Sequence, residues 1–239
     1  MATKPILFNT EMVRAILDRR KTCTRRILKG AIPFDEKAEY WNVLKKGEWS
    51  GPICVEYFMK QGSPYKPGDI LYVRETFAWQ PCWDCGMDTE QGACTDHIYH
   101  SEKKEYGCYM YRASCEDNEY PSADTWHPSI HMPKEAARIW LKVKNVRVER
   151  LQEMKPVDVI KEGAYPDCWD CLNTYEESGS QCCYGTEEQC SQCDGVMMEW
   201  EKLWNSTIKK TDIDRYGWDA NPWVWVIEFE RCKKPKGEN

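Results

Sequence analysis

The sequence predicts an α+β fold in which short strands outnumber a few short helices. Two segments, residues 70–76 and 223–231, carry apolar side chains at alternating positions, which is the pattern of strands with one buried face. Helical spacing is confined to residues 10–17, 157–162 and 196–205. No stretch of the 239 residues has the composition of a linker, so we expect a single domain over residues 1–239. A small mixed β-barrel with short helices fits these elements.

Glycine and proline residues set the ends of several elements. They interrupt residues 30–66, so we expect loops there, with one short strand at residues 53–58. Pro156 and Gly163 bracket a short helix, because proline favours the first helical turn and glycine favours the position past the end. Glu162 therefore lies at the carboxyl end of that helix.

A strongly basic stretch, residues 19–26, lies between the first helix and the strand expected after it. The whole chain has a net charge of −6, whereas residues 1–33 hold eight Lys or Arg against two acids. A local cationic site within an acidic protein favours a specific pocket for an anion or a nucleic acid over a surface that coats DNA. The alternative is a solvated helix end whose basic residues complement the helix dipole.

The motif Lys21-x-x-Thr24-x-Arg26 resembles the signature of the ASCH domain family, at the end of that family's first helix. Three further stretches resemble the family in its order, especially its longer phage and prophage members: residues 68–76, 126–152 and 217–229. The resemblance implies a PUA-like β-barrel. Arg19 stands where the signature has glycine, and a residue with a Cβ bears a cost in the left-handed conformation that ends many helices.

Lys21 and Thr24 are three positions apart, close enough to meet whether the chain is helical or is turning into a strand. The neighbouring arginines disfavour the charged form of Lys21, which lowers its pKa and lets it accept the proton of the Thr24 hydroxyl. The motif is similar to that of short bacterial family members that hydrolyse N4-acetylcytidine. This resemblance implies a catalytic set of Lys21, Thr24 and Glu162, with Glu162 as the acid. The residues alone leave simpler roles open: Thr24 as a strand residue, Lys21 as a phosphate ligand and Glu162 as a solvated helix end.

Six further residues are expected to contact the substrate: Arg20, Arg25, Arg26, Arg74, Glu75 and His131. The resemblance implies an amidohydrolase that removes an acyl group from a modified cytidine-type base, in a nucleoside or in RNA. One alternative is a reader of RNA or modified DNA that binds through its arginines and stacks aromatic rings on a base, without chemistry. Another is a zinc-stabilised adaptor of phage origin that docks a protein partner.

The role expected for the 14 cysteines depends on the cellular compartment of the protein. The chain has no signal-peptide pattern and no run of 18 apolar residues, so we expect a cytoplasmic protein with no membrane partner. In a reducing cytosol, cysteines spaced as C-x-x-C favour metal binding over disulfide bonds.

Two cysteine-rich inserts are expected, at about residues 80–125 and 166–195. In the second, two C-x-x-C pairs stand eighteen residues apart, the spacing of a structural zinc site with four cysteines. This insert has few apolar residues, so metal would supply its stability. The first insert offers ligands for a second ion or for a site shared by both inserts. Unmetallated thiols and a catalytic zinc are the remaining alternatives. The expected ligands of one or two zinc ions are Cys168, Cys171, Cys190, Cys193, Cys82, Cys85, Cys94 and His97.

Overall fold

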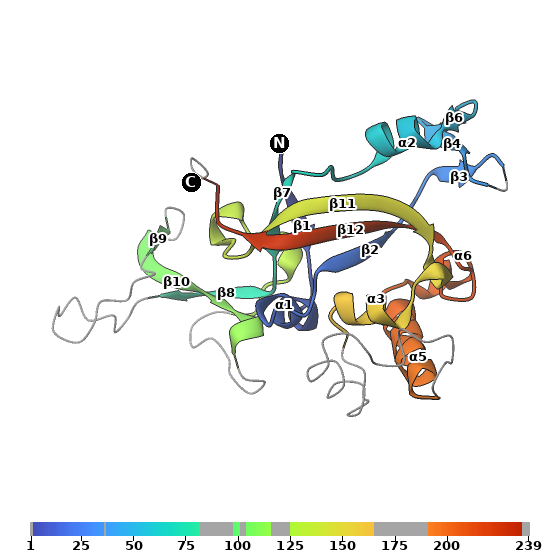
Figure 1. The fold of residues 1–239 in the computed structure, drawn as a ribbon. Helices are drawn as coiled ribbons and strands as arrows, with labels where there is room; N and C mark the ends of the chain where they lie inside the picture. The colour runs from blue at the N-terminus through green and yellow to red at the C-terminus, as the bar shows by residue number, and fades with distance from the viewer. Residues whose placement is uncertain are drawn as a thin grey trace. The chain divides into compact units, whose positions relative to one another are not determined.

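The computed structural model describes residues 2–35, 37–81, 98–100, 104–115, 125–164 and 191–235 (Figure 1). Strands predominate in these residues and the helices are few, which confirms the predicted α+β class. No sheet in the described part of the chain closes into a barrel, so the PUA-like barrel stays a prediction. None of the described helices is long and apolar enough to cross a membrane.

Most of the predicted elements are present, with longer or shifted ends. The strands are β1 (Thr3–Leu7), β2 (Cys23–Ile27), β3 (Ala31–Pro33), β4 (Tyr40–Lys45), β5 (Glu48–Trp49), β6 (Ile53–Cys54), β7 (Ile70–Arg74), β8 (Phe77–Pro81), β9 (Ile98–His100), β10 (Glu105–Tyr111), β11 (Trp140–Arg150) and β12 (Trp223–Cys232). The helices are α1 (Thr10–Leu17), α2 (Val55–Gly62), α3 (Pro156–Lys161), α5 (Ser191–Ser206) and α6 (Ile213–Tyr216). The strand predicted at residues 53–58 is wrong beyond Cys54, because helix α2 begins at Val55.

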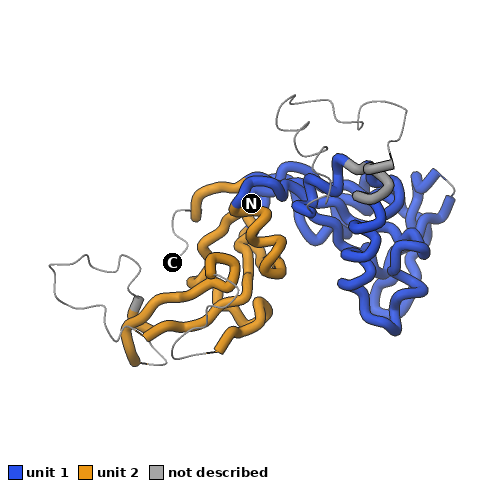
Figure 2. Tube along the Cα trace, turned by 90° about the horizontal axis from the view of Figure 1, so that it is seen from below, with its two compact units in different colours: residues 1–2, 18–69, 142–230 blue, residues 3–17, 70–141, 231–239 orange. Residues whose placement is uncertain are grey.

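The described strands form three sheets. The largest has the order β1-β7-β11-β12-β2, the second has the order β8-β10-β9, and the third has the order β3-β4-β5 with β6 paired to β4. Contacts divide the chain into two compact units, shown in Figure 2. Unit 1 comprises residues 1–2, 18–69 and 142–230, and unit 2 comprises residues 3–17, 70–141 and 231–239.

In unit 1, strands β2 and β12 are antiparallel, with Arg25 opposite Val226 and Arg26 opposite Trp225. Partners across a sheet share one face, while neighbours along a strand point to opposite faces. Arg25 therefore shares a face with Val226, and Arg26 shares the other face with Trp225. Arg25 and Arg26 of the basic stretch thus lie on opposite faces of the sheet.

Helices α3 and α5 pack on the face of β12 that carries Val226. The core on this face comprises Leu151, Met154, Val159, Trp200, Trp204, Val224 and Val226. Helix α3 has Pro156 in its first turn, and Gly163 follows it with a φ of 83°, as the sequence predicts. Burial of Val159 therefore anchors α3 and fixes Glu162, the residue that follows it.

Aromatic rings pack on the opposite face of β12. Trp41 stacks on Phe58 with 5.0 Å between ring centroids, and it meets Trp223 edge-on at 4.9 Å. Phe58 in turn stacks on Trp225 at 5.4 Å. Trp41, Phe58 and Trp225 are buried, so these contacts tie β4 and α2 to β12 within unit 1.

In unit 2, β1 pairs in parallel with β7. Leu71, Val73 and Glu75 alternate along β7 and beyond it, and all three are buried. The Glu75 carboxylate accepts hydrogen bonds from Nε and Nη2 of Arg138, each at 2.9 Å. This two-pronged ion pair compensates a carboxylate that would be costly to bury alone.

Helix α1 is capped by Asn9, whose side-chain oxygen accepts a hydrogen bond from the amide of Met12 at 2.9 Å. The helix ends at Leu17, and Arg19 follows with a φ of 64°. Arg19 therefore adopts the left-handed conformation that glycine favours, at the position where the ASCH signature has glycine.

Candidate functional site

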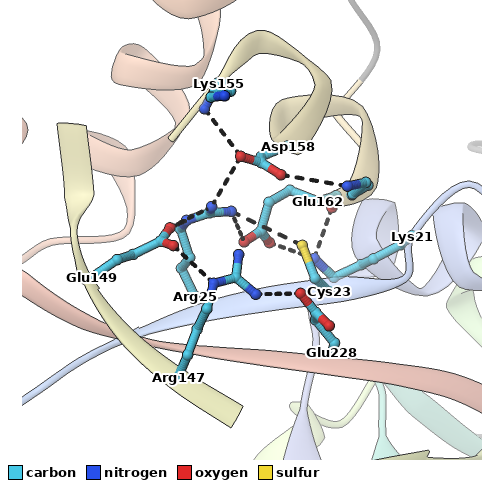
Figure 3. Close-up of polar contacts among 10 residues, drawn as sticks. Lys21, Cys23, Arg25, Arg147, Glu149, Lys155, Asp158, Glu162 and Glu228 are labelled. Carbon is cyan, nitrogen blue, oxygen red and sulfur yellow. Dashed lines mark hydrogen bonds and ion pairs between the residues drawn. The ribbon is translucent and has the colours of Figure 1, made fainter. Parts of the chain in front are cut away.

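Lys21 and Glu162 form a buried ion pair in unit 1 (Figure 3). Lys21 Nζ lies 2.8 Å from Glu162 Oε2 and donates to the backbone carbonyl of Glu162 at 2.7 Å. The two side chains are 0% and 2% exposed. The structure thus brings together two of the three predicted catalytic residues, which are 141 positions apart in the chain.

Backbone hydrogen bonds hold the two ends of this pair in place. The amide of Thr22 donates to the carbonyl of Lys161 at 2.8 Å, and the amide of Phe229 donates to the carbonyl of Thr22 at 2.9 Å. The segment that carries Lys21 is therefore joined both to the last residue of α3 and to β12. These backbone hydrogen bonds keep the segment of Lys21 beside the end of α3 independently of the ion pair between Lys21 and Glu162.

Arg25 is a second cation on the Glu162 carboxylate. Its Nη1 donates to Glu162 Oε1 at 3.1 Å, and its side chain is 1% exposed. Its Nε and Nη2 donate to Glu149 Oε1 at 3.0 and 2.6 Å, and Nη2 lies 3.7 Å from Asp158 Oδ2. Arg25 was predicted to contact substrate, whereas here its guanidinium is occupied by acids from β11 and α3.

The network continues from Glu149 toward the surface. Arg147 Nε lies 3.1 Å from Glu149 Oε2, and Arg147 Nη1 donates to Glu228. The side chain of Glu149 is 14% exposed, whereas that of Glu228 is 41% exposed. A chain of alternating charges therefore runs from the buried pair to solvent, as Figure 3 shows.

Burial is the main influence on the titration of this site. It lowers the pKa of Lys21, although Glu162 opposes the shift. The sequence argument attributed this lowering to neighbouring arginines, but Arg26 contributes least among the causes. Burial, reinforced by Glu162, raises the pKa of the Cys23 thiol. Burial opposes ionisation of Arg25, but Glu162 and Glu149 outweigh it and raise the pKa of Arg25.

Thr24 and Arg26 point away from Arg25. Thr24 is buried opposite Ile227, and strand alternation directs its side chain to the face shared with Arg26 and Trp225. Arg26 is exposed, on the face of β2 opposite that of Arg25. The role of Thr24 as the nucleophile stays a prediction.

The remaining predicted substrate ligands divide between the units. Arg20, in unit 1, donates to the carbonyl of Gly163 at 2.8 Å and to Asp18 at 2.9 Å. Arg74, Glu75 and His131 belong to unit 2. There Glu75 is paired with Arg138, Arg74 donates to the carbonyl of Ile130, and His131 is exposed. Unit 1 thus contains Arg20, Arg25 and Arg26 together with the predicted catalytic set.

The proposed zinc ligands are not tested by this structure. Cys82, Cys85, Cys94, His97, Cys168, Cys171 and Cys190 lie outside the described residues. Cys193 belongs to helix α5, but its side chain is not described. No group of three or more metal-ligating side chains occurs within the described ranges.

Sequence reasoning missed the acids that surround Arg25. Glu149 and Asp158 are separated from Arg25 by most of the chain, so spacing in the sequence could not join them. The sequence held one indication of these acids. Arg147 and Glu149 are two positions apart on β11, so their side chains lie on the same face of the strand. A charged pair on one face of a partly buried strand indicates a polar partner opposite it.

Comparison with known proteins adds no further likeness. No family model matches the chain, and no curated protein or solved structure matches it significantly. The resemblance to the ASCH family therefore rests on the motifs quoted above and on no wider similarity.

Proposed function

We propose that the chain is a PUA-like amidohydrolase of ASCH type that removes an acyl group from the N4 amine of a cytidine-type base, as a nucleoside or within RNA. The observation that carries this proposal is the contact between Lys21 Nζ and Glu162 Oε2 at 2.8 Å. A buried lysine with a lowered pKa, paired with a carboxylate, is suited to accept and return a proton.

The reaction requires one proton to move from a nucleophile to the leaving amine. As a hydroxyl oxygen attacks the acyl carbon, neutral Lys21 takes the hydroxyl proton and becomes an ammonium. The C–N bond then breaks, and the N4 nitrogen receives a proton to leave as the cytosine amine. If Thr24 supplies the hydroxyl, the acyl group is transferred to its oxygen and water releases it. If water supplies it, the carboxylic acid forms directly.

Hydrolysis of defined substrates tests the proposal. Purified protein is incubated with N4-acetylcytidine and with longer N4-acylcytidines, and cytidine is quantified by chromatography. We expect product from the wild type and at least a hundredfold slower release from Lys21→Ala, in the range of about 10²–10⁴ for lost acid–base catalysis. The exposed residue Lys144 is the matched control, and Lys144→Ala retains the wild-type rate. Equal rates for Lys21→Ala and the wild type remove the catalytic role of Lys21.

Replacement of Thr24 separates the two nucleophiles. Thr24→Val keeps the shape of the buried side chain and removes its hydroxyl. Loss of activity with retained folding supports Thr24, whereas an unchanged rate assigns the attack to water.

A second candidate function is a reader of RNA or modified DNA. The observation that favours it is the exposed Arg26, which lies on the face of β2 opposite that of Arg25. An exposed arginine can contact a phosphate of a nucleic acid, whereas the neighbouring Trp225 is buried against Phe58. Binding of this kind weakens steeply with salt, because phosphate contacts release counterions. Salt-independent binding by both the wild type and Arg26→Ala would argue against it.

A further inference from the structure

We propose that Arg25 is a positioning residue that keeps Glu162 ionised, so that Lys21 alone carries the proton in both halves of the reaction. This inference rests on the proposed amidohydrolase function. It replaces the expected role of Glu162 as the acid and that of Arg25 as a substrate ligand.

The two oxygens of Glu162 have separate cationic partners. Oε2 faces Lys21 Nζ at 2.8 Å, and Oε1 accepts from Arg25 Nη1 at 3.1 Å. A guanidinium does not lose its proton in a protein, whereas a buried amine readily does. When Lys21 is neutral, Glu162 therefore retains Arg25 as a cationic partner, which it shares with Glu149. Protonating Glu162 instead would leave Arg25 facing a neutral group in a site that excludes water.

Arg25 is itself held rigidly in the orientation that this role needs. Its Nε and Nη2 converge on Glu149 Oε1 at 3.0 and 2.6 Å, which leaves Nη1 directed at Glu162. The fork geometry of the guanidinium lets one side chain join two carboxylates in this way. Lysine at this position would keep the charge but could not reproduce all three contacts.

The neighbouring elements place both cations and acids around Glu162, and the acids have cationic partners. Strand β2 supplies Arg25, Arg26 and the neutral thiol of Cys23, and the segment before it supplies Lys21. Helix α3 supplies Asp158, which lies 3.7 Å from Lys161 Nζ, so its charge has a local partner. Glu149 and Glu228 are both paired with Arg147. Asp158, Glu149 and Glu228 thus each have a cation beside them other than Lys21.

The consequence for the reaction is a single proton carrier. Lys21 accepts the hydroxyl proton as the bond from oxygen to the acyl carbon forms. The same ammonium then donates to N4 as the C–N bond breaks, which returns Lys21 to its neutral form. Glu162 remains a carboxylate throughout and stabilises the ammonium between the two steps.

Carbon-13 NMR of labelled Glu and Lys side chains tests the assignment without relying on activity. Glu162→Gln and Lys21→Met identify the two resonances by their loss. Between about pH 5 and 10, we expect the Glu162 carboxyl to keep the chemical shift of a carboxylate while the Lys21 Cε signal titrates. A Glu162 carboxyl that titrates in the range of activity overturns the proposal. A Lys21 signal that stays that of an ammonium to pH 10 also overturns it.

Three variants then assign the effect to Arg25. In Arg25→Met, the Glu162 carboxyl signal differs from that of the wild type, and hydrolysis falls at least tenfold. Arg25→Lys keeps Glu162 ionised and restores part of the rate. Lys144→Met is the matched control, because exposed Lys144 pairs with Glu230, outside the network of Arg25 and Glu162, and it leaves the Glu162 signal unchanged.

Separate outcomes distinguish failure of this inference from failure of the proposed function. If the wild type hydrolyses no N4-acylcytidine, the amidohydrolase proposal fails, while the NMR titration still decides which group is ionised. If Arg25→Met does not fold, the wild-type titration and Arg25→Lys carry the test. A Glu162 signal identical in Arg25→Met and the wild type contradicts the positioning role.

Discussion

Replacing Glu162 with glutamine should destabilise the protein far more than an equivalent change on the surface. Gln keeps the size of the side chain but removes the charge that faces Lys21 and Arg25, whose side chains are 0% and 1% exposed. Removing one partner of a buried ion pair costs about 3–5 kcal/mol, because the remaining charge is left uncompensated. Arg25 keeps Glu149, and Lys21 keeps the carbonyl of residue 162, so we expect about 3 kcal/mol.

Urea unfolding followed by tryptophan fluorescence measures this cost, since Trp200 and Trp204 pack in the core that anchors α3. The matched control is the exposed pair Lys144–Glu230, whose side chains are 55% and 50% exposed. Glu230→Gln should change the free energy of unfolding by less than about 1 kcal/mol. In the double variant Lys21→Met with Glu162→Gln, the two costs should not add, because both substitutions remove the same contact. A cost for Glu162→Gln no greater than that for Glu230→Gln would refute the reasoning.

Three further predictions concern the turn before the site, its titration and the metal. Arg19→Gly should raise the free energy of unfolding by up to about 1 kcal/mol, because Arg19 has a φ of 64°, and a loss of stability in thermal unfolding would contradict this. The lowered pKa of Lys21 means that the unfolded chain binds more protons between that pKa and about 10.4, so stability should rise with pH in this window. Unfolding curves of the wild type and Lys21→Met should diverge there, and parallel pH dependence would count against a lowered pKa. The C-x-x-C pairs at Cys168 and Cys190 predict structural zinc, so elemental analysis should find zinc that Cys190→Ser reduces. Metal-free protein that resists proteolysis across residues 166–195 would exclude this role.

Local patterns predicted the elements that frame the site. Alternation along residues 70–76 and 223–231 predicted strands β7 and β12, and the Pro156 and Gly163 bracket predicted helix α3. These elements could be predicted because the alternation of apolar side chains and the backbone preferences of proline and glycine depend on residues only a few positions apart. The segment at residues 53–58 was misread, since helix α2 instead buries Phe58 among the aromatic rings. A tertiary contact there outweighs the local preference.

The burial of the basic stretch could not be predicted from its composition. Lys21 and Arg25 are charged and adjacent to other cations, which favours exposure in the absence of partners. Their partners Glu149 and Glu162 lie 124 and 137 positions away from Arg25, and only the fold brings them together. The pairing of Lys21 with Glu162 was expected from family resemblance alone. The division of Arg25 and Arg26 between two faces follows from the register of β2 with β12.

A crystal structure of the Thr24→Val variant with bound N4-acetylcytidine would show whether the acylated base reaches Lys21. The account predicts that the acylated base lies at Lys21, with Lys21 Nζ within hydrogen-bonding distance of the amide and Glu162 still paired with Arg25. The distance from residue 24 to the acyl carbon would also decide whether Thr24 can attack it. A base bound on the face of Arg26 and Trp225, with the Lys21–Glu162 pair closed and remote from it, would contradict the catalytic account.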